Sequence, residues 1–410
     1  MRTDPLRRAV DQVLGNDNCS GCGGCALVSD RITIGLSENS YMRPTLAPPR
    51  VQETRAEAMA EAKIFKAMCP GIRVAAPRIP NQKNDETFGP YLSAWVSWAT
   101  DPEIRHAGSS AGVITAFTNW LIETRRSTVV VASQEDPKNP RRTIPLKLTS
   151  REDAIRAAGS RYAPVANLSA VSASNFAKQA IVGKPCEATA LAQLSNTLKI
   201  PDEDRPITIS FFCAGTPRQS ATDALTDLLD APSDQITSLK YRGDGWPGKF
   251  KVTLNTGESK TMSYDKSWGT HLGRTVQWRC KLCVDGTGGH ADIAVGDYWE
   301  VDSRGYPVFE NADGRSVVIA RTPRGHRLLR DAANDGVLAM SPLDLKLVAA
   351  VQPLQVDRKR TLAARMLGRM LAGKRTPRYS GYGLTRLAAT TRRSFRAAAG
   401  TFVRTRQSGK

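Results

Sequence analysis

The sequence lacks any apolar run near the ~20 residues that a membrane-spanning helix needs. Its opening, MRTDPLRRAV, also lacks the apolar stretch of a secretion signal. The chain has 410 residues and is 40% hydrophobic, which is typical of a globular protein with roughly two or three domains. We therefore expect a cytoplasmic protein in a reducing compartment.

A reducing compartment disfavours disulfides, so metal binding explains the eight cysteines better. Three of them are separated by two residues each, in Cys19-Ser20-Gly21-Cys22-Gly23-Gly24-Cys25. An iron–sulfur cubane needs several thiolates around one small object, and a glycine-rich loop lets the backbone wrap that object. Zinc knuckles normally use two separated Cys-x2-Cys pairs. The spacing therefore favours a [4Fe–4S] cluster over zinc or free thiols.

This motif lacks its own fourth cysteine. The usual bacterial ferredoxin run ends in Cys-Pro, whereas this chain has Ser29-Asp30 at that place. A Cys-Pro pair occurs later, as Cys69-Pro70, after a helix predicted over about 52–67. The simplest interpretation is one cluster held by Cys19, Cys22, Cys25 and Cys69.

The other four cysteines allow two interpretations. Cys186 follows a predicted strand, Cys213 ends another, and Cys280 and Cys283 form a Cys-x2-Cys pair. Two ligands at neighbouring strand ends and a chelating pair could close a second [4Fe–4S] site. Alternatively, Cys186 and Cys213 are small buried hydrophobic residues.

Acidic residues are absent from 358–410, which contains fifteen Lys and Arg residues. Subtracting fifteen from the net charge of +19 leaves +4 for residues 1–357. A charge confined to one end argues against a nucleic-acid enzyme and for a docking tail. Leu362–Ala372 is basic and amphipathic, a pattern that suits an anionic membrane surface. The alternative is a partly disordered, solvated tail.

Apolar strands alternate with helices in the middle of the chain, which indicates an α+β or α/β fold with helices on both faces of a sheet. We expect a ferredoxin-like cluster module packed on a mixed α/β flavin-binding core, followed by a basic helical or disordered tail. The predicted units are 1–75 (cluster module), 76–90 (linker), 91–235 (flavin-binding core), 236–350 (C-terminal α/β part) and 358–410 (basic tail).

Several motifs recur in the order seen in one known family. Besides the first cysteine motif they are HAGSSAGVITAF (His106–Phe117), GSRYAPV (Gly159–Val165), GKPCEATAL (Gly183–Leu191), FFCAGTP (Phe211–Pro217) and CKLCVDGTGGHADIAVGDYW (Cys280–Trp299). Over about 15–330, the chain resembles the beta subunit family of coenzyme F420-dependent hydrogenases and dehydrogenases. The resemblance implies an FAD-dependent oxidoreductase with one or two [4Fe–4S] clusters and coenzyme F420 as a candidate substrate.

The resemblance also suggests where FAD binds. A Gly/Ser loop before a helix leaves free amides that favour a phosphate, although the same loop is otherwise an ordinary helix cap. Asp297 orients a ligand in this interpretation and makes a simple Asx turn in the alternative. The predicted cofactor-binding residues are Gly108, Ser109, Ser110, Ala111, Gly112, Ser160, Arg161, Tyr162 and Asp297.

Three residues are predicted to assist the reaction. His106 is a candidate proton donor to a reduced substrate. Arg161 and Lys184 are candidates for stabilising the anionic reduced flavin. The alternatives are a structural histidine, a solvated arginine at a strand edge and a lysine that faces solvent.

The expected function joins one-electron clusters to a two-electron flavin. We expect a ferredoxin-like donor or a redox partner subunit, a homo-oligomer as one option, and no specific nucleic acid. The competing hypotheses are a non-catalytic electron-transfer subunit and an accessory protein of cell-surface polysaccharide biosynthesis at the inner face of the membrane. Some relatives implied by the resemblance are encoded among polysaccharide-synthesis genes.

Overall fold

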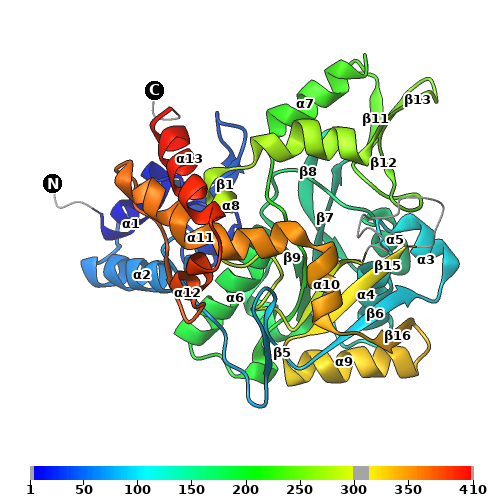
Figure 1. Ribbon diagram of the computed structural model, residues 1–410, viewed down its shortest axis with the longest axis horizontal. Helices are drawn as coiled ribbons and strands as arrows, with labels where there is room; N and C mark the ends of the chain where they lie inside the picture. Colours follow the sequence, from blue (N-terminus) through cyan, green and yellow to red (C-terminus); the bar gives the residue numbers. More distant parts are fainter. Residues whose placement is uncertain (1–3, 299–313, 408–410) are drawn as a thin grey trace.

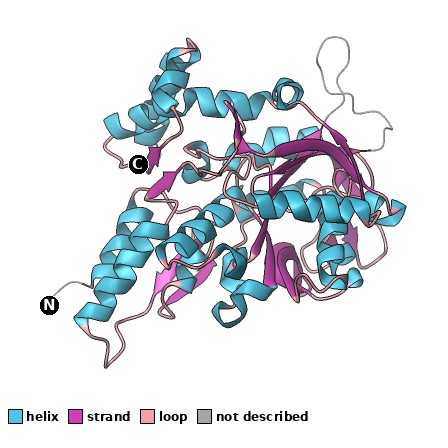
Figure 2. Cartoon of the chain, turned by 90° about the horizontal axis from the view of Figure 1, so that it is seen from below, coloured by secondary structure: helices cyan, strands magenta, loops and turns pink. Residues whose placement is uncertain are grey.

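The computed structural model describes residues 4–298 and 314–407. A mixed sheet of eight strands lies at its centre, with helices on both sides (Figures 1 and 2). In spatial order the strands are β16 (Leu338–Pro342), β6 (Ser93–Ala99), β15 (Arg315–Ala320), β14 (Ile293–Tyr298), β10 (Ile207–Phe211), β9 (Gln179–Gly183), β7 (Val129–Asp136) and β8 (Asn139–Leu148). Strands β14, β10, β9 and β7 run parallel, and the flanking strands pair antiparallel. The mixed α/β class predicted from the sequence is confirmed.

Successive residues of the central strands are buried on opposite faces, as the pleat of a strand requires. Val130 packs against α4 (Val113–Glu123) and α9 (Pro323–Asn334) on one face. Val131 packs on the other face, against α6 (Pro185–Thr197) and residues of the N-terminal module. Burial on both faces explains why these strands read as continuous apolar runs. Further helices are α3 (Pro102–Ala107), α5 (Arg151–Arg156), α7 (Gln219–Leu228), α8 (Trp278–Lys281) and α10 (Leu345–Val351).

Strand β8 was not predicted. It contains Pro140 and Pro145 and occupies the edge of the sheet beside β7. Proline cannot donate to a strand ladder, so it is tolerated at an edge but hides the strand from pattern reading. A smaller sheet of β11 (Ile236–Lys240), β12 (Lys249–Leu254) and β13 (Ser259–Ser263) packs against α7.

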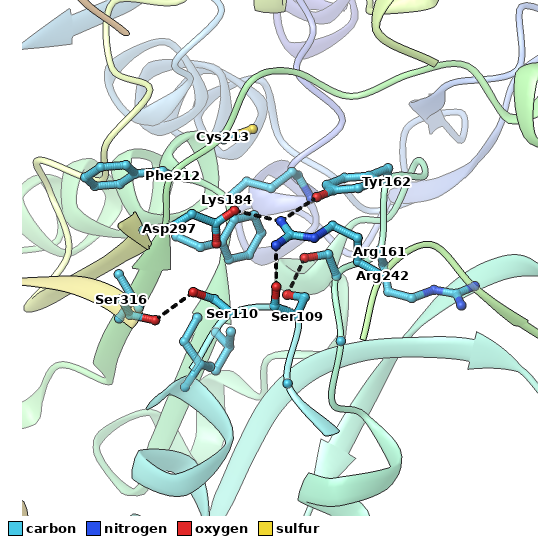
Figure 3. Close-up of a pocket in the computed structure, with 18 of the residues that line it drawn as sticks. Ser109, Ser110, Arg161, Tyr162, Lys184, Phe212, Cys213, Arg242, Asp297 and Ser316 are labelled. Carbon is cyan, nitrogen blue, oxygen red and sulfur yellow. Dashed lines mark hydrogen bonds and ion pairs between the residues drawn. The ribbon is translucent and has the colours of Figure 1, made fainter. Parts of the chain in front are cut away.

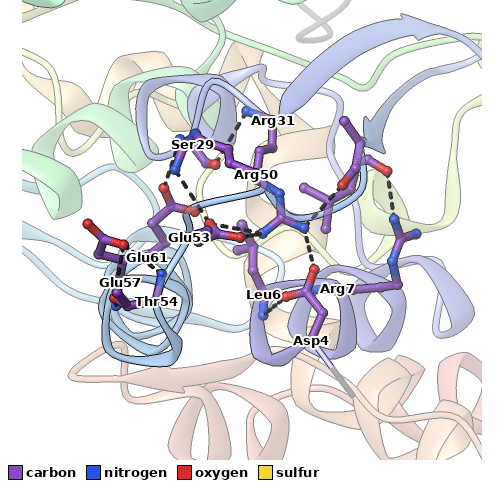
Figure 4. Close-up of polar contacts among 12 residues, drawn as sticks. Asp4, Leu6, Arg7, Ser29, Arg31, Arg50, Glu53, Thr54, Glu57 and Glu61 are labelled. Carbon is purple, nitrogen blue, oxygen red and sulfur yellow. Dashed lines mark hydrogen bonds and ion pairs between the residues drawn. The ribbon is translucent and has the colours of Figure 1, made fainter. Parts of the chain in front are cut away.

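The N-terminal module consists of α1 (Pro5–Gly15), β1 (Ile32–Leu36), β2 (Met42–Leu46), α2 (Arg55–Met68) and β3 (Arg73–Ala75). Buried Arg31 joins the starts of both helices, because it pairs with Asp4 and, at 2.9 Å, with Glu53 (Figure 4). Burial raises the pKa of Asp4, but the hydrogen bond and charge of Arg31 outweigh it and the pKa lies below its usual value. The exposed Asp30, at the place of the proline that would follow the missing fourth cysteine, pairs with Arg50.

The predicted linker over 76–90 is more ordered than expected. It includes the hairpin of β4 (Lys83–Asp85) and β5 (Gly89–Tyr91). Phe88 is fully buried and stacks on Phe212 with ring centroids 5.7 Å apart. One aromatic side chain thus anchors a segment whose composition is otherwise typical of a loop.

The basic C-terminal segment is folded. It forms α11 (Pro353–Leu371), β17 (Arg378–Ser380), α12 (Leu384–Ala389) and α13 (Arg393–Gln407) and lies beside α1 and α2 (Figure 1). Arg369 is buried and pairs with Asp17 at 2.9 Å, and β17 pairs with β3 in parallel. Among the helices of the described ranges, none is both long and apolar enough to cross a membrane.

Candidate functional site

A cavity of about 460 Å³ opens at the carboxyl ends of the parallel strands. Its wall contains every residue that the sequence predicted for cofactor binding, from Gly108–Gly112, Ser160–Tyr162 and Asp297. Its volume lies within the range of about 300–1,000 Å³ that is usual for ligand pockets. In an open α/β sheet, ligands bind at this edge.

Two glycines shape the loop that precedes α4. Gly112 caps the helix with φ of +68°, and a Cβ there would lie 2.5 Å from the carbonyl oxygen of Ile104. A Cβ on Gly108 would lie 2.8 Å from the backbone of Gly112. Among the described residues, no side chain caps the amides of the first turn of α4. These amides border the cavity and favour an anion there.

Arg242 supplies the buried cation of this cavity. It pairs with Asp297 at 2.7 Å, donates to the carbonyl oxygen of Ser109 and approaches the Tyr162 hydroxyl at 3.4 Å (Figure 3). Burial lowers the pKa of Arg242, but Asp297 together with Tyr162 and Tyr264 outweighs that effect and raises it overall. The positive charge is therefore permanent. The sequence analysis missed this residue, although the glycine-rich run that follows it, Gly243-Asp244-Gly245-Trp246-Pro247-Gly248, was a usable signal.

Arg161 borders the cavity, but its guanidinium is bonded within the protein. Its guanidinium donates to the carbonyl oxygens of Leu239, Pro140 and Arg142 and to the Thr143 hydroxyl. These contacts occupy its donors within the protein, so they disfavour the predicted role at a phosphate or reduced flavin.

His106 also differs from the expectation. It is exposed on α3 and is absent from the described wall of the cavity. Its position therefore does not support proton donation into the cavity.

Lys184 lines the cavity but is buried rather than solvated. Its Nζ donates to Glu187 at 2.6 Å and to the carbonyl oxygen of Val165 at 2.8 Å. The Glu187 carboxylate, fully buried, also accepts from the backbone N–H groups of Lys184 and Asn167 at 2.7 and 3.0 Å. Burial lowers the pKa of Lys184, but Glu187 together with Cys186 and Cys213 raises it more, so the ion pair persists. This pair fixes the first turn of α6 and thus Cys186 within it.

The first cysteine group lines a small cavity of about 30 Å³ in the N-terminal module. Its wall contains Cys19, Cys22, Cys25 and Cys69 and otherwise only apolar, glycine and serine residues. The amide of Gly21 donates to Cys19 Sγ at 3.4 Å. Gly21 has φ of +67°, and a Cβ there would lie 2.8 Å from the carbonyl oxygen of Met42. The loop therefore requires glycine.

The chemistry of these thiols fits an iron–sulfur cluster. Burial raises the pKa values of Cys22, Cys25 and Cys69, and neighbouring thiolates raise them further. These three thiols become thiolates together only beside a strong positive charge, which iron supplies. Over 4–298 and 314–407, no three Cys, His, Asp or Glu side chains are arranged for a single metal ion. A cubane is larger than one ion, so this result does not bear on it.

The second cysteine group lies between the first group and the large cavity. Burial, followed by the charges of Cys280 and Cys283, raises the pKa of Cys213 to about 12. Burial has the largest effect on Cys186 and raises the pKa of its thiol. The charges of Cys22 and Cys213 raise this pKa further. Cys213 itself lines the large cavity. The four remaining cysteines thus come together, and one of them borders the predicted flavin site.

Gln277 connects the two groups. Its side-chain amide donates to the carbonyl oxygen of Ser20, next to Cys19, and contacts Cys280 Sγ at 3.5 Å. Arg279, two residues further, is buried and donates to the carbonyl oxygen of Pro70 at 3.0 Å. Segments far apart in the sequence therefore lie side by side between the cysteine groups.

The C-terminal segment supports the loops of the second group. Arg358 donates to the carbonyl oxygens of Cys213 and Ala214 at 2.9 and 2.7 Å. Lys359 donates to the carbonyl oxygen of Val284 at 3.3 Å. Tyr379 donates to that of Leu282, between Cys280 and Cys283. The basic residues near the start of this segment therefore have structural contacts and are not a solvated tail.

Comparison with known proteins agrees with this geometry. Residues 94–172 match the family model of the coenzyme F420 hydrogenase/dehydrogenase beta subunit N-terminus, and 176–346 match that of its C-terminus. The first cysteine group and residues 353–407 lie outside both matches. Comparison with curated proteins found no match.

A solved structure has the same fold. It is a chain of the F420-reducing [NiFe] hydrogenase complex from Methanosarcina barkeri, with 21% identity and a TM-score of 0.53. The alignment covers 72% of this chain and 98% of that chain. Of the sequence motif Cys280–Trp299, the last residue, Trp299, lies outside the described residues. The two family matches together span more than half of the sequence, so the chain belongs to the coenzyme F420 hydrogenase/dehydrogenase beta subunit family of oxidoreductases.

Proposed function

We propose that the protein is an FAD- and [4Fe–4S]-dependent oxidoreductase that passes electrons between a one-electron carrier and a two-electron acceptor. The observation that carries the proposal is the position of Cys213. It belongs to the second cysteine group and also lines the cavity of about 460 Å³. A cluster held there would adjoin a ligand in the cavity.

The residues of the cavity have distinct roles in this proposal. The loop Gly108–Gly112 and the first amides of α4 would hold a phosphate of FAD. Arg242 keeps a permanent positive charge beside the cavity, which would favour an anionic reduced flavin. Bound FAD supplies two-electron chemistry, and iron–sulfur clusters supply one-electron transfer.

The proposed electron path follows the order of the cysteine groups. Electrons enter at the group of Cys19 and cross beside Cys22 and Cys186. They then reach the cavity at Cys213. The family description makes coenzyme F420 a candidate acceptor, and an organic substrate is the alternative. A ferredoxin-like donor or a partner subunit would provide the electrons, since the similar solved chain belongs to a hydrogenase complex.

Anaerobic purification tests the proposal directly. We expect brown protein with about eight irons, two clusters of four, and one FAD per chain. Elemental analysis, visible spectroscopy and identification of the extracted cofactor measure these quantities. Iron without flavin would support a non-catalytic electron-transfer subunit instead. Colourless protein without iron or flavin would contradict both functions.

A second candidate function is an accessory role at an anionic membrane, including polysaccharide biosynthesis at the cell surface. One face of α13 favours it, because Phe395, Phe402 and Val403 are 81%, 38% and 49% exposed. Helical spacing places Arg396 and Arg406 beside them on the same exposed side. Apolar side chains beside arginines suit an anionic bilayer surface.

Vesicle co-sedimentation tests this second function. We expect the variant Phe395→Ser/Phe402→Ser to bind vesicles containing anionic phosphatidylglycerol at least tenfold more weakly than the unchanged protein. These point changes are preferable to removal of 358–410, because Arg358 and Lys359 contact the cysteine loops. Vesicles of neutral lipid are the control. Equal binding of both proteins to anionic vesicles would dismiss the membrane role of α13.

A further inference from the structure

Three exposed arginines from distant parts of the chain gather beside the first cysteine group. They are Arg73 on β3 and Arg375 and Arg378 from the segment after α11. We call them the arginine rim. We propose that the rim docks the acidic face of a one-electron carrier protein and so brings it to the first cysteine group. This inference rests on the proposed redox function.

Backbone hydrogen bonds fix the rim to the cysteine loop. The amide of Arg73 donates to the carbonyl oxygen of Cys69 at 3.2 Å. The carbonyl oxygen of Arg375 accepts from the Asn18 side chain at 2.9 Å, and Asn18 directly precedes Cys19. The amide of Arg378 donates to the carbonyl oxygen of Ile72 at 2.9 Å. Each arginine is therefore anchored within a few residues of a predicted cluster ligand.

The rim concentrates positive charge that the protein itself does not neutralise. Arg378 is the register partner of Arg73 in the parallel pair of β17 and β3, so both side chains emerge on the same exposed face. Like charges opposite each other in a sheet destabilise it. Among the described residues, none forms an ion pair with Arg73, Arg375 or Arg378. Such an arrangement is favourable when an anionic partner covers it.

The position of the rim indicates what kind of partner this is. The exposed Arg73 is four residues from Cys69, and its amide donates to the Cys69 carbonyl oxygen, so a cluster held there would lie close to the rim. Electron transfer requires close approach, and a carrier attracted to the rim would approach this group rather than the distant cavity. All three arginines of the rim lie outside the family matches, which cover 94–172 and 176–346. The rim places their positive charge at the expected entry point.

The test measures how fast the carrier reduces the iron-loaded, full-length protein. The rim variant is Arg73→Gln/Arg375→Gln/Arg378→Gln. Its matched control is Arg327→Gln/Arg330→Gln/Lys346→Gln, which removes the same charge from exposed positions on α9 and α10, away from α1 and α2 (Figure 1). The probe is a reduced bacterial-type ferredoxin of strongly negative net charge, followed by stopped-flow absorbance.

We expect the second-order rate constant of the rim variant to fall about tenfold or more at low salt, since electrostatic steering contributes factors of that size. The rates of the unchanged protein and the rim variant should converge as salt rises. Reduction by dithionite, iron content and the control variant should be unaffected.

Three outcomes would overturn the inference, and they are distinguishable. If the rim and control variants carry iron and react with ferredoxin at equal rates, the rim is not the docking surface but the proposed function stands. If the unchanged protein holds no cluster that dithionite reduces, the proposed function fails and this inference fails with it. Loss of vesicle binding by the rim variant with an unchanged ferredoxin rate would assign the rim to lipid instead.

Discussion

Glu187→Gln is expected to lower the free energy of unfolding by about 3–5 kcal/mol, the usual effect of breaking a buried ion pair. Glu187 is fully buried and accepts three hydrogen bonds, two of them from Lys184. Glutamine has nearly the same shape but leaves the Lys184 ammonium without its counter-charge. The amide nitrogen of the glutamine would also face one of the N–H donors that bond to the carboxylate of Glu187. Since whole proteins are stable by only about 5–15 kcal/mol, the loss is large. Denaturant unfolding measures this loss, with a check that the free energy of unfolding falls with denaturant concentration at the same slope in both proteins.

The position of Cys186 gives this variant a second readout. Cys186 directly precedes Glu187 in the first turn of α6, so disorder there should reduce the iron held by the second cysteine group. The iron of the first group should remain. Glu57→Gln is the matched control, because Glu57 occupies the same third position of α2 but is exposed. Equal stability of the two variants would show that burial of the Lys184–Glu187 pair is unimportant.

Arg242→Gln is expected to lower the free energy of unfolding by about 3 kcal/mol and to weaken flavin binding tenfold or more. The change removes the partner of Asp297 and the donor to the Ser109 carbonyl oxygen, so the loop before α4 loses a support (Figure 3). The side chain of Asp297 is 25% exposed. We therefore expect the loss in free energy of unfolding to lie at the lower end of the range for buried ion pairs. Thermal unfolding and flavin fluorescence titration measure the two effects.

A matched control separates the site from general charge effects. Lys251→Gln removes a pair with Asp244 whose side chains are 35% and 34% exposed, and such pairs contribute about 0–1 kcal/mol. Its flavin affinity should be unchanged. If Arg242→Gln protein is folded and binds flavin as tightly as the unchanged protein, Arg242 has no role in the cofactor site.

The central strands were predictable because both of their faces are buried. The apolar runs at Ile207–Phe211 and Gln179–Gly183 could be recognised as strands without knowing which strands lie beside them. Strand β8 escaped prediction because its prolines are acceptable only at a sheet edge, which the sequence does not reveal. The division of the chain into four domains and a linker stays a prediction, as do the functional roles of the individual residues.

The candidate site also has some features that were predictable from the sequence and others that were not. Glycines of the loop before α4 were predictable, since their conformations depend on local sterics. The different contacts of Arg161 and Arg242 were not, because both are basic residues in polar runs. Only tertiary packing turns Arg161 toward the carbonyl oxygens of the protein and Arg242 toward Asp297.

By itself, the sequence determined the family motifs, the apolar strands and the spacing of Cys19, Cys22 and Cys25, because each depends on residues that are neighbours in the chain. The tertiary structure decided between the two interpretations of Cys186 and Cys213, which approach other cysteines, and it alone showed that basic residues after 357 contact those loops. The physical reason is distance along the chain: a contact between residues hundreds of positions apart depends on how whole elements pack, and no local pattern records it.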